Sequence, residues 1–181
     1  TGQANAALFH FTGDIQNHND VIFTSFTVGA NATNVRVWTD SFMNGTNFDP
    51  ITALWTADGN LVSENDDDDS VNPSTQTKFD SGFTLANLSA GSYIFSVATF
   101  NNFANGSNLA SGFSFDNENP IALSQWSQPA NGRNMGTFWS VWVDGVDIAS
   151  NPDATNVPEP SSLALFGLAL LGFGLKKKKK A

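Results

Sequence analysis

The sequence predicts an all-β fold: an antiparallel sandwich of the jelly-roll type, followed by a short C-terminal transmembrane helix. Three observations predict the sandwich. Short runs rich in Val, Ile, Phe, Trp and Thr recur between turn dipeptides, polarity alternates within several runs, and no window before residue 158 has a convincing helical period. Many short strands with tight turns and no crossover helices are typical of antiparallel sandwiches.

Nine runs are the expected strands. In chain order they span residues 7–11, 21–28, 34–39, 51–56, 61–64, 77–85, 92–100, 112–115 and 137–144. The turn dipeptides are Asn44-Gly45, Asp58-Gly59, Asn105-Gly106, Asn131-Gly132 and Asp144-Gly145. Glycine suits such turns because it adopts positive φ without strain at a Cβ atom. Alternation is clearest where Tyr93, Phe95 and Val97 fall on one face of a strand and Ser96 and Ala98 on the other.

The expected organisation has five parts. Residues 1–6 are a signal-peptide remnant, 7–150 the sandwich, 151–160 a linker with a Pro-Glu-Pro motif, 161–175 a transmembrane helix and 176–181 a basic cytoplasmic tail. Ala4-Asn5-Ala6 has the small-x-small pattern that precedes a signal-peptidase cut, so the mature protein is expected to begin at Ala7. A domain of about 150 residues is long enough to bury a real core.

The C-terminal segment has the pattern of an anchor. The run from Leu163 to Leu175 has no charged or polar side chain, and as a helix it spans roughly 20 Å of a hydrocarbon core of about 30 Å. Five lysines, Lys176 to Lys180, follow it and indicate a cytoplasmic flank, with the sandwich on the other side of the membrane. The alternative is a buried helix of the domain, which a lysine block at the end of the run disfavours.

The same segment resembles a known sorting signal. Val157-Pro158-Glu159-Pro160, the apolar run and the basic end are similar to the PEP-CTERM signal of Gram-negative bacteria, although lysines stand where arginines are more usual. The resemblance implies export across the inner membrane, with signal peptidase and exosortase as processing partners. It also implies cleavage near the Pro158, Glu159 and Pro160 motif and removal of the helix. The mature product would then lie at the cell surface or be secreted.

Composition excludes several functions. There is no cysteine, so disulfides and thiolate chemistry are ruled out. Residues 1–157 carry 16 acidic residues and three basic ones (Arg36, Lys78 and Arg133), a net charge near −13. Binding to nucleic acid is disfavoured because nothing neutralises phosphates, and contact with a membrane is expected only through the C-terminal helix. A divalent cation is the natural partner of such a surface.

A second resemblance covers roughly residues 20–100. Residues 48–67 read as a strand, an Asp58-Gly59-Asn60 turn, a second strand and an acidic loop, and Gly91-Ser92-Tyr93 begins a later strand. This order is similar to the bacterial pre-peptidase C-terminal (PPC) domain, a β-sandwich of secreted proteases. The resemblance implies a sandwich that binds calcium through the acidic loop and acidic residues nearby.

Calcium is the cofactor that the residues themselves indicate. Five carboxylates and one carboxamide occur within residues 64–69, and a cation with six to eight oxygen ligands would offset their repulsion. Within the loop the candidate ligands are Glu64, Asn65, Asp66, Asp67 and Asp69, and the resemblance to PPC domains implies Asp49 as a further ligand. No EF-hand spacing is present. The alternative is a solvated acidic loop that keeps an exposed hairpin soluble.

Catalysis finds little support, and no catalytic residue is predicted. His10 and His18 are the only histidines, and no G-x-S-x-G motif is present. The turn around His18 is expected to be structural.

Carbohydrate binding is the main alternative to a purely structural role, since five tryptophans are many for one domain. Trp38 and Trp126 are the candidate stacking platforms, against the alternative of tryptophans buried in the core.

The expected function is therefore that of an exported, exosortase-sorted cell-surface or extracellular-matrix protein. It would be a non-enzymatic structural or binding module stabilised by calcium, for example in a biofilm matrix. The alternative is a calcium-dependent carbohydrate-binding or adhesin module with an extracellular polysaccharide as its partner.

Overall fold

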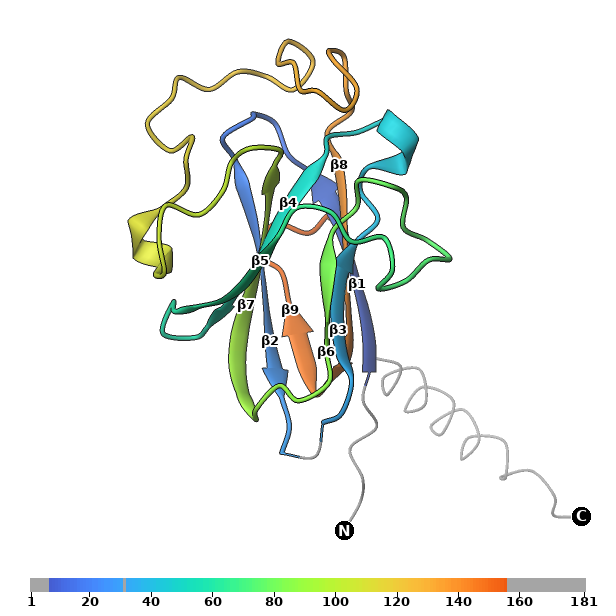
Figure 1. Cartoon of the computed structure of the whole chain (residues 1–181), viewed down its shortest axis with the longest axis vertical. Helices are drawn as coiled ribbons and strands as arrows, with labels where there is room; N and C mark the ends of the chain where they lie inside the picture. Colours follow the sequence, from blue (N-terminus) through green and yellow to red (C-terminus); the bar gives the residue numbers. More distant parts are fainter. Residues whose placement is uncertain (1–6, 31, 156–181) are drawn as a thin grey trace, which may run out of the picture.

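The computed structural model describes residues 7–30 and 32–155, which fold into two antiparallel sheets packed face to face (Figure 1). The strands are β1 (Ala7–Asp14), β2 (Val21–Val28), β3 (Val35–Thr39), β4 (Pro50–Thr56), β5 (Leu61–Asn65), β6 (Gly82–Leu85), β7 (Gly91–Thr99), β8 (Phe138–Val146) and β9 (Ile148–Ser150). Two short 3₁₀ turns, at Met43–Gly45 and Leu109–Ser111, complete the regular structure of these residues. The all-β prediction is therefore confirmed.

Four predicted features lie outside the described residues. They are the signal-peptide remnant 1–6, the Pro158-Glu159-Pro160 motif, the helix 161–175 and the basic tail 176–181. Within residues 7–30 and 32–155, no helix is long and apolar enough to span a membrane.

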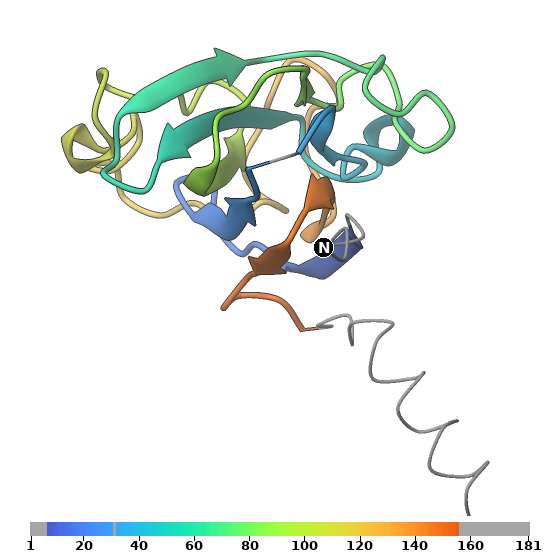
Figure 2. The ribbon, with the colours of Figure 1, turned by 90° about the horizontal axis from the view of Figure 1, so that it is seen from below.

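The two sheets have the strand order of a jelly roll. One sheet runs β1-β8-β3-β6 and the other β5-β4-β7-β2-β9, and every ladder is antiparallel. Counted in chain order, strands 1-8-3-6 face strands 5-4-7-2, as in an eight-stranded jelly roll, and β9 extends the second sheet beyond β2. Figure 2 shows the sheet from below, with β4 and β5 on one side and β9 on the other.

Alternating side chains from both sheets form the main core. Phe9 and Phe11 of β1 and Val141 and Val143 of β8 point inward from the four-stranded sheet. From the other sheet come Tyr93, Phe95 and Val97 of β7, as the alternation predicted, together with residues of β2 and β4. This two-sided burial sets the register of the strands, because a shift of one residue would turn every inward side chain outward.

A smaller apolar cluster lies on the outer face of the five-stranded sheet. Ala53 and Trp55 of β4 pack there against Phe113, which belongs to the long connection between β7 and β8. Trp55 Nε1 donates to Ser96 Oγ at 2.9 Å, which satisfies its buried indole. Strand β4 is consequently buried on both faces.

The strand predictions differ from the structure in four places. The strand expected at 7–11 continues to Asp14 as β1. Residues 112–115 form only an isolated bridge, Ala104 to Phe113, because the connection that holds them has no neighbouring strand with which to form a ladder. The strand expected at 77–85 begins at Gly82, since the Asp80 carboxylate accepts from Thr77 N and closes a turn there. Strand β9 was missed, because three residues directly after a turn carry too little pattern to detect.

Candidate metal centre

The β4–β5 hairpin brings two acidic segments together. Asp49 directly precedes β4, whereas Asp66 and Asp67 directly follow β5. The strands are antiparallel, with Thr52 opposite Asn65, so the start of one and the end of the other meet at the same edge of the sheet. A tight turn closes the other end of the hairpin, where Gly59 has a φ of 80°.

Three carboxylates converge at this edge. Asp49, Asp66 and Asp67 each offer one oxygen, and these oxygens all lie within 4.8 Å of one another. Asp49 is only 4% exposed, Asp66 is half-buried and Asp67 is exposed. The Oδ1 atoms of Asp49 and Asp66 are buried and accept no hydrogen bond from any described residue. Buried acceptors without protein partners are rare and costly, so these oxygens are suited to a proton, a water molecule or a cation.

The pKa values of these three carboxyl groups are all raised, which shows that negative charge is disfavoured where they converge. Burial, followed by repulsion from Asp67, Asp66 and Asp80, raises the pKa of Asp49 to about 8. Burial also raises the pKa of Asp66. The pKa of Asp67 is raised by burial and by the charges of Asp66 and Asp69, against an opposing effect of Lys78. An oxygen-only ligand set with this excess of negative charge fits a hard divalent cation such as Ca²⁺.

A chain of amide side chains holds the Asp49 segment in place. Gln128 Oε1 accepts from Asp49 N at 3.3 Å, and Gln128 Nε2 donates to Asn131 Oδ1 at 2.8 Å. Asn131 Nδ2 in turn donates to the carbonyl oxygens of Gly45 (2.9 Å) and Asn47 (2.6 Å). Sequence reasoning missed both Gln128 and Asn131, and the only signal was the Asn131-Gly132 turn.

Asp80 lies near the cluster and has a different role. Its Oδ1 accepts from Phe42 N (2.9 Å) and Thr39 Oγ1 (3.3 Å), and its Oδ2 accepts from Thr77 N (2.7 Å). Burial raises the pKa of Asp80, and the hydrogen bonds from Phe42 and Thr77 oppose this effect. Both oxygens of Asp80 accept hydrogen bonds from the protein, so Asp80 fixes the end of the β5–β6 connection. Its charge also raises the pKa of Asp49.

Glu64 and Asp69 do not join the converging carboxylate oxygens, and the Asn65 amide nitrogen is used elsewhere. Glu64 Oε1 accepts from Ala104 N at 2.8 Å and so fixes the β7–β8 connection. Asn65 Nδ2 donates to Gly82 O at 3.1 Å, and the Asp69 side chain is exposed.

The predicted stacking platform at Trp38 is wrong. Its ring points out of the four-stranded sheet but is only 1% exposed, because the β5–β6 connection lies over it. Trp38 Nε1 donates to Thr75 Oγ1 at 3.4 Å, and the Arg36 guanidinium lies 5.2 Å from the ring centroid. Trp126 is half-buried and packs against the rings of His18 and Phe115.

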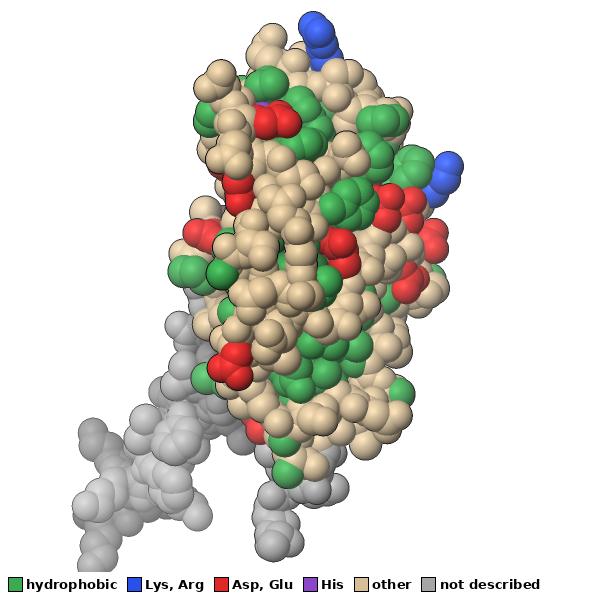
Figure 3. All heavy atoms as spheres, turned by 60° about the vertical axis from the view of Figure 1, so that its left-hand side comes forward, with side chains coloured by type: hydrophobic (Ala, Val, Ile, Leu, Met, Phe, Trp, Pro, Cys, Tyr) green, Lys and Arg blue, Asp and Glu red, His purple; other side chains and the backbone are tan. Residues whose placement is uncertain are grey.

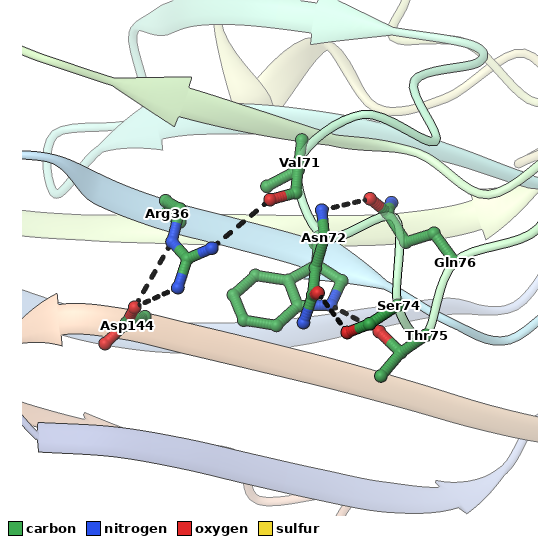
Figure 4. A network of polar contacts seen from close by, with 8 residues as sticks. Arg36, Val71, Asn72, Ser74, Thr75, Gln76 and Asp144 are labelled. Atoms are coloured by element: carbon green, nitrogen blue, oxygen red, sulfur yellow. Dashed lines mark hydrogen bonds and ion pairs between the residues drawn. The ribbon is translucent and has the colours of Figure 1, made fainter.

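Figure 4 shows how this connection is fastened over the sheet. Arg36 forms an ion pair with Asp144 of the neighbouring strand and donates to Val71 O at 3.3 Å. Within the connection, Asn72 N donates to Gln76 Oε1 at 2.7 Å. The segment that begins with the acidic cluster is therefore tied to the outer face of the four-stranded sheet.

Both histidines make structural contacts. His18 is buried, its Nδ1 accepts from Ile121 N at 3.1 Å, and its Nε2 lies 3.0 Å from Glu118 Oε2. His10 stacks on Trp142 with ring centroids 3.6 Å apart, and its Nε2 lies 2.9 Å from Ser140 Oγ. Burial lowers the pKa of His10.

The surface of the described residues is strongly acidic. On the face drawn in Figure 3, acidic side chains are spread widely and basic ones lie only at the margin. This distribution agrees with the composition of residues 1–157 and favours cationic over anionic partners.

Comparison with known proteins identifies the C-terminal segment. The family described as the PEP-CTERM protein-sorting motif matches residues 156–179, which contain the Pro-Glu-Pro motif, the apolar run and most of the lysines. The match does not extend into the sandwich. No curated protein matches the chain.

Proposed function

We propose that this protein is an exported, non-enzymatic module of the cell surface or extracellular matrix, with a sandwich stabilised by calcium. The PEP-CTERM motif at residues 156–179 supports export and sorting by exosortase. In this proposal exosortase cleaves near Pro158 to Pro160 and removes the apolar run and the lysines. The sandwich is then released into, or displayed toward, the extracellular medium of a Gram-negative cell.

The observation that carries the calcium part is the convergence of Asp49, Asp66 and Asp67, with buried oxygens on Asp49 and Asp66 that lack protein partners. These three residues would hold the ion, and backbone or water oxygens would complete its coordination. The ion would supply charge neutralisation, not chemistry. It would fasten the β5–β6 connection to the start of β4. The resemblance of residues 20–100 to PPC domains also favours a calcium ion held by this acidic loop and by acidic residues near it.

The proposal that the protein is not an enzyme rests on the contacts that its histidines and Asp40 make within the fold. His18 is buried between backbone and Glu118, and Asp40 accepts from Trp142 Nε1 at 3.0 Å and makes no hydrogen bond to either histidine. A general base needs its ring nitrogen within reach of a bound substrate. His18 is 1% exposed and does not meet this condition. His10 is half-buried, but its ring stacks on Trp142 and its Nε2 lies 2.9 Å from Ser140 Oγ.

Calorimetric titration of the full chain with Ca²⁺ tests the calcium part. We expect saturable binding to the wild type, and a loss of affinity of at least about tenfold for Asp49→Asn and Asp66→Asn, because each removes a charged ligand. Asp69→Asn is the matched control, since it removes one charge from the same loop outside the converging group. Equal affinity of Asp49→Asn and Asp69→Asn would contradict the proposed ligand set, as would absence of binding at millimolar Ca²⁺.

Mass spectrometry of the secreted protein tests the processing. We expect a C-terminus near Pro158 to Pro160 and an N-terminus near Ala7. Recovery of secreted protein that still carries the lysine block would contradict cleavage by exosortase. Pro158→Ala with Pro160→Ala is the variant in which the chain should stay membrane-bound.

A further inference from the structure

A second feature lies on the outer face of the five-stranded sheet and shares no residue with the acidic cluster. It is a hollow of about 430 Å³ between the start of β2 and the β7–β8 connection. Asn19 and Asp20 line it from one side, Leu109 and Asp116 from the other, and Phe23 and Phe113 form its apolar part. The hollow is shallow and open to solvent, so a ligand would lie against it and would not be enclosed.

The apolar part is rigidly supported. Phe113 is 5% exposed and packs edge-on against the buried Trp55, with centroids 6.1 Å apart. Phe23 is half-buried, and its ring is tilted by 58° to that of Phe113 at a centroid distance of 6.3 Å. Phe23 therefore presents partly exposed aromatic surface on a base of buried rings, the kind of surface on which the C–H face of a sugar ring packs.

The polar rim consists of acceptors that the backbone orients. Asp20 Oδ2 accepts from Asn17 N at 2.7 Å and from Gln16 N at 3.1 Å, and Asp116 Oδ2 accepts from Phe113 N at 2.8 Å. Each carboxylate keeps its other oxygen without a partner among the described residues. Each is therefore oriented by one oxygen and has the other available to a ligand.

Two further details belong to this rim. Gly112 has a φ of +71°, and a Cβ atom there would lie 1.9 Å from Asp116 Oδ2, so only glycine lets the carboxylate take this position. Asn19 Oδ1 is buried without a partner among the described residues, while Asn19 Nδ2 donates to Glu118 O at 3.2 Å. Asn19 therefore ties this side of the hollow to the backbone at Glu118.

We propose that this hollow binds a neutral sugar residue of an extracellular polysaccharide. The rim supplies acceptors and the base supplies apolar surface, so the matching ligand brings hydroxyl donors and an apolar face. No basic residue lines the hollow, so phosphates and acidic sugars would be repelled. The two carboxylates would also attract an ammonium group, and the oligolysine arm of the experiment distinguishes such a ligand from a neutral sugar.

Affinity electrophoresis of the full chain tests this proposal. The protein is kept in a zwitterionic detergent that has no sugar headgroup. It is run in native gels with and without a soluble glucan, galactan or mannan, and separately with oligolysine. We expect at least one neutral polysaccharide to retard the wild type. Asp116→Asn, which replaces an acceptor by an amide donor, and Phe23→Leu should each weaken the retardation by about fivefold or more.

Asp58→Asn is the matched control, because it makes the same charge change in the exposed β4–β5 turn and should bind like the wild type. Melting curves check that each variant is folded, and Asp116→Asn alone decides the matter if Phe23→Leu is unstable. The proposal is overturned if no neutral polysaccharide retards the protein, if Asp116→Asn binds like Asp58→Asn, or if only oligolysine binds. The last result would indicate a cation site.

Discussion

A carboxylate oxygen of Asp49 lies within 4.8 Å of one of Asp66, although one residue precedes β4 and the other follows β5. The hairpin between them is closed by backbone pairing and by the burial of Leu54 and Trp55, so the fold imposes this proximity against the repulsion of the two charges. We therefore expect the site to respond to protons and to cations, and the predictions on pH and on Ca²⁺ follow from this.

In chelator, the protein should lose stability as the pH rises from about 4 toward about 9. The pKa of Asp49 is about 8 in the folded state, above the value of about 3.9 in an unfolded chain. The folded state therefore holds this proton more tightly. Its contribution to stability is complete below the unfolded pKa and is lost as the pH rises through the folded pKa. Melting temperatures across this range measure it.

Asp49→Asn is the comparison for the pH series. It should flatten the upper part of the curve, between about pH 6 and 9, since the raised pKa of Asp49 governs that part. Asp66 and Asp67, whose pKa values are also raised, leave some slope at lower pH. A variant curve parallel to that of the wild type throughout would argue against a protonated Asp49.

Binding of Ca²⁺ should release a proton near pH 7. Asp49 is largely protonated there and must ionise to become a ligand, so affinity should rise with pH up to about 8 and then level off. Calorimetry in two buffers of different ionisation enthalpy measures the proton count, which we expect to be close to one near pH 7 and to fall toward zero above about pH 9. A count that stays constant over this range would contradict the prediction.

Asn131→Ala should destabilise the domain by about 1–3 kcal/mol, because it leaves the carbonyl oxygens of Gly45 and Asn47 without their donor. It should also weaken binding of Ca²⁺, since Gln128 would lose the partner that orients it toward Asp49. Urea denaturation gives the first effect and calorimetry the second. Asn117→Ala, at an exposed position, is the control, and equal stability of the two variants would refute the role of Asn131.

Arg36→Ala should loosen the β5–β6 connection without unfolding the sandwich. The Arg36–Asp144 pair is partly exposed, so its contribution is only about 1 kcal/mol, but Arg36 also donates to Val71 O and covers Trp38. Hydrogen exchange in residues 70–76 should become about fivefold faster, while exchange in the core strands stays unchanged. Arg133→Ala, an exposed cation elsewhere, should leave this exchange as in the wild type.

Much of the sandwich could be predicted from local pattern. Strand β2 matches its predicted bounds, and β3, β4, β5, β7 and β8 agree to within one or two residues, because alternation and turn dipeptides mark them directly. The run at residues 112–115 has the composition of a strand and is not one. It lies where no partner strand is available, and composition cannot report on a partner.

The candidate metal site was also only partly predictable from the sequence. The acidic loop identified Asp66 and Asp67 as candidate ligands, and Asp49 was a candidate only through the resemblance to PPC domains. That Glu64 turns to Ala104, and that Gln128 supports Asp49, depends on the path of the long β7–β8 connection. This path has no local signature in the sequence.

The sequence by itself determined the class of fold, the strongly acidic charge and the sorting motif, because periodicity, composition and a contiguous motif are properties of neighbouring residues. Only the tertiary structure decided which acidic side chains converge, that Trp38 is covered, and that Asp20 and Asp116 flank one hollow. These outcomes join residues far apart in the chain. They are set by which strands pair and by where the connections pack to bury apolar surface.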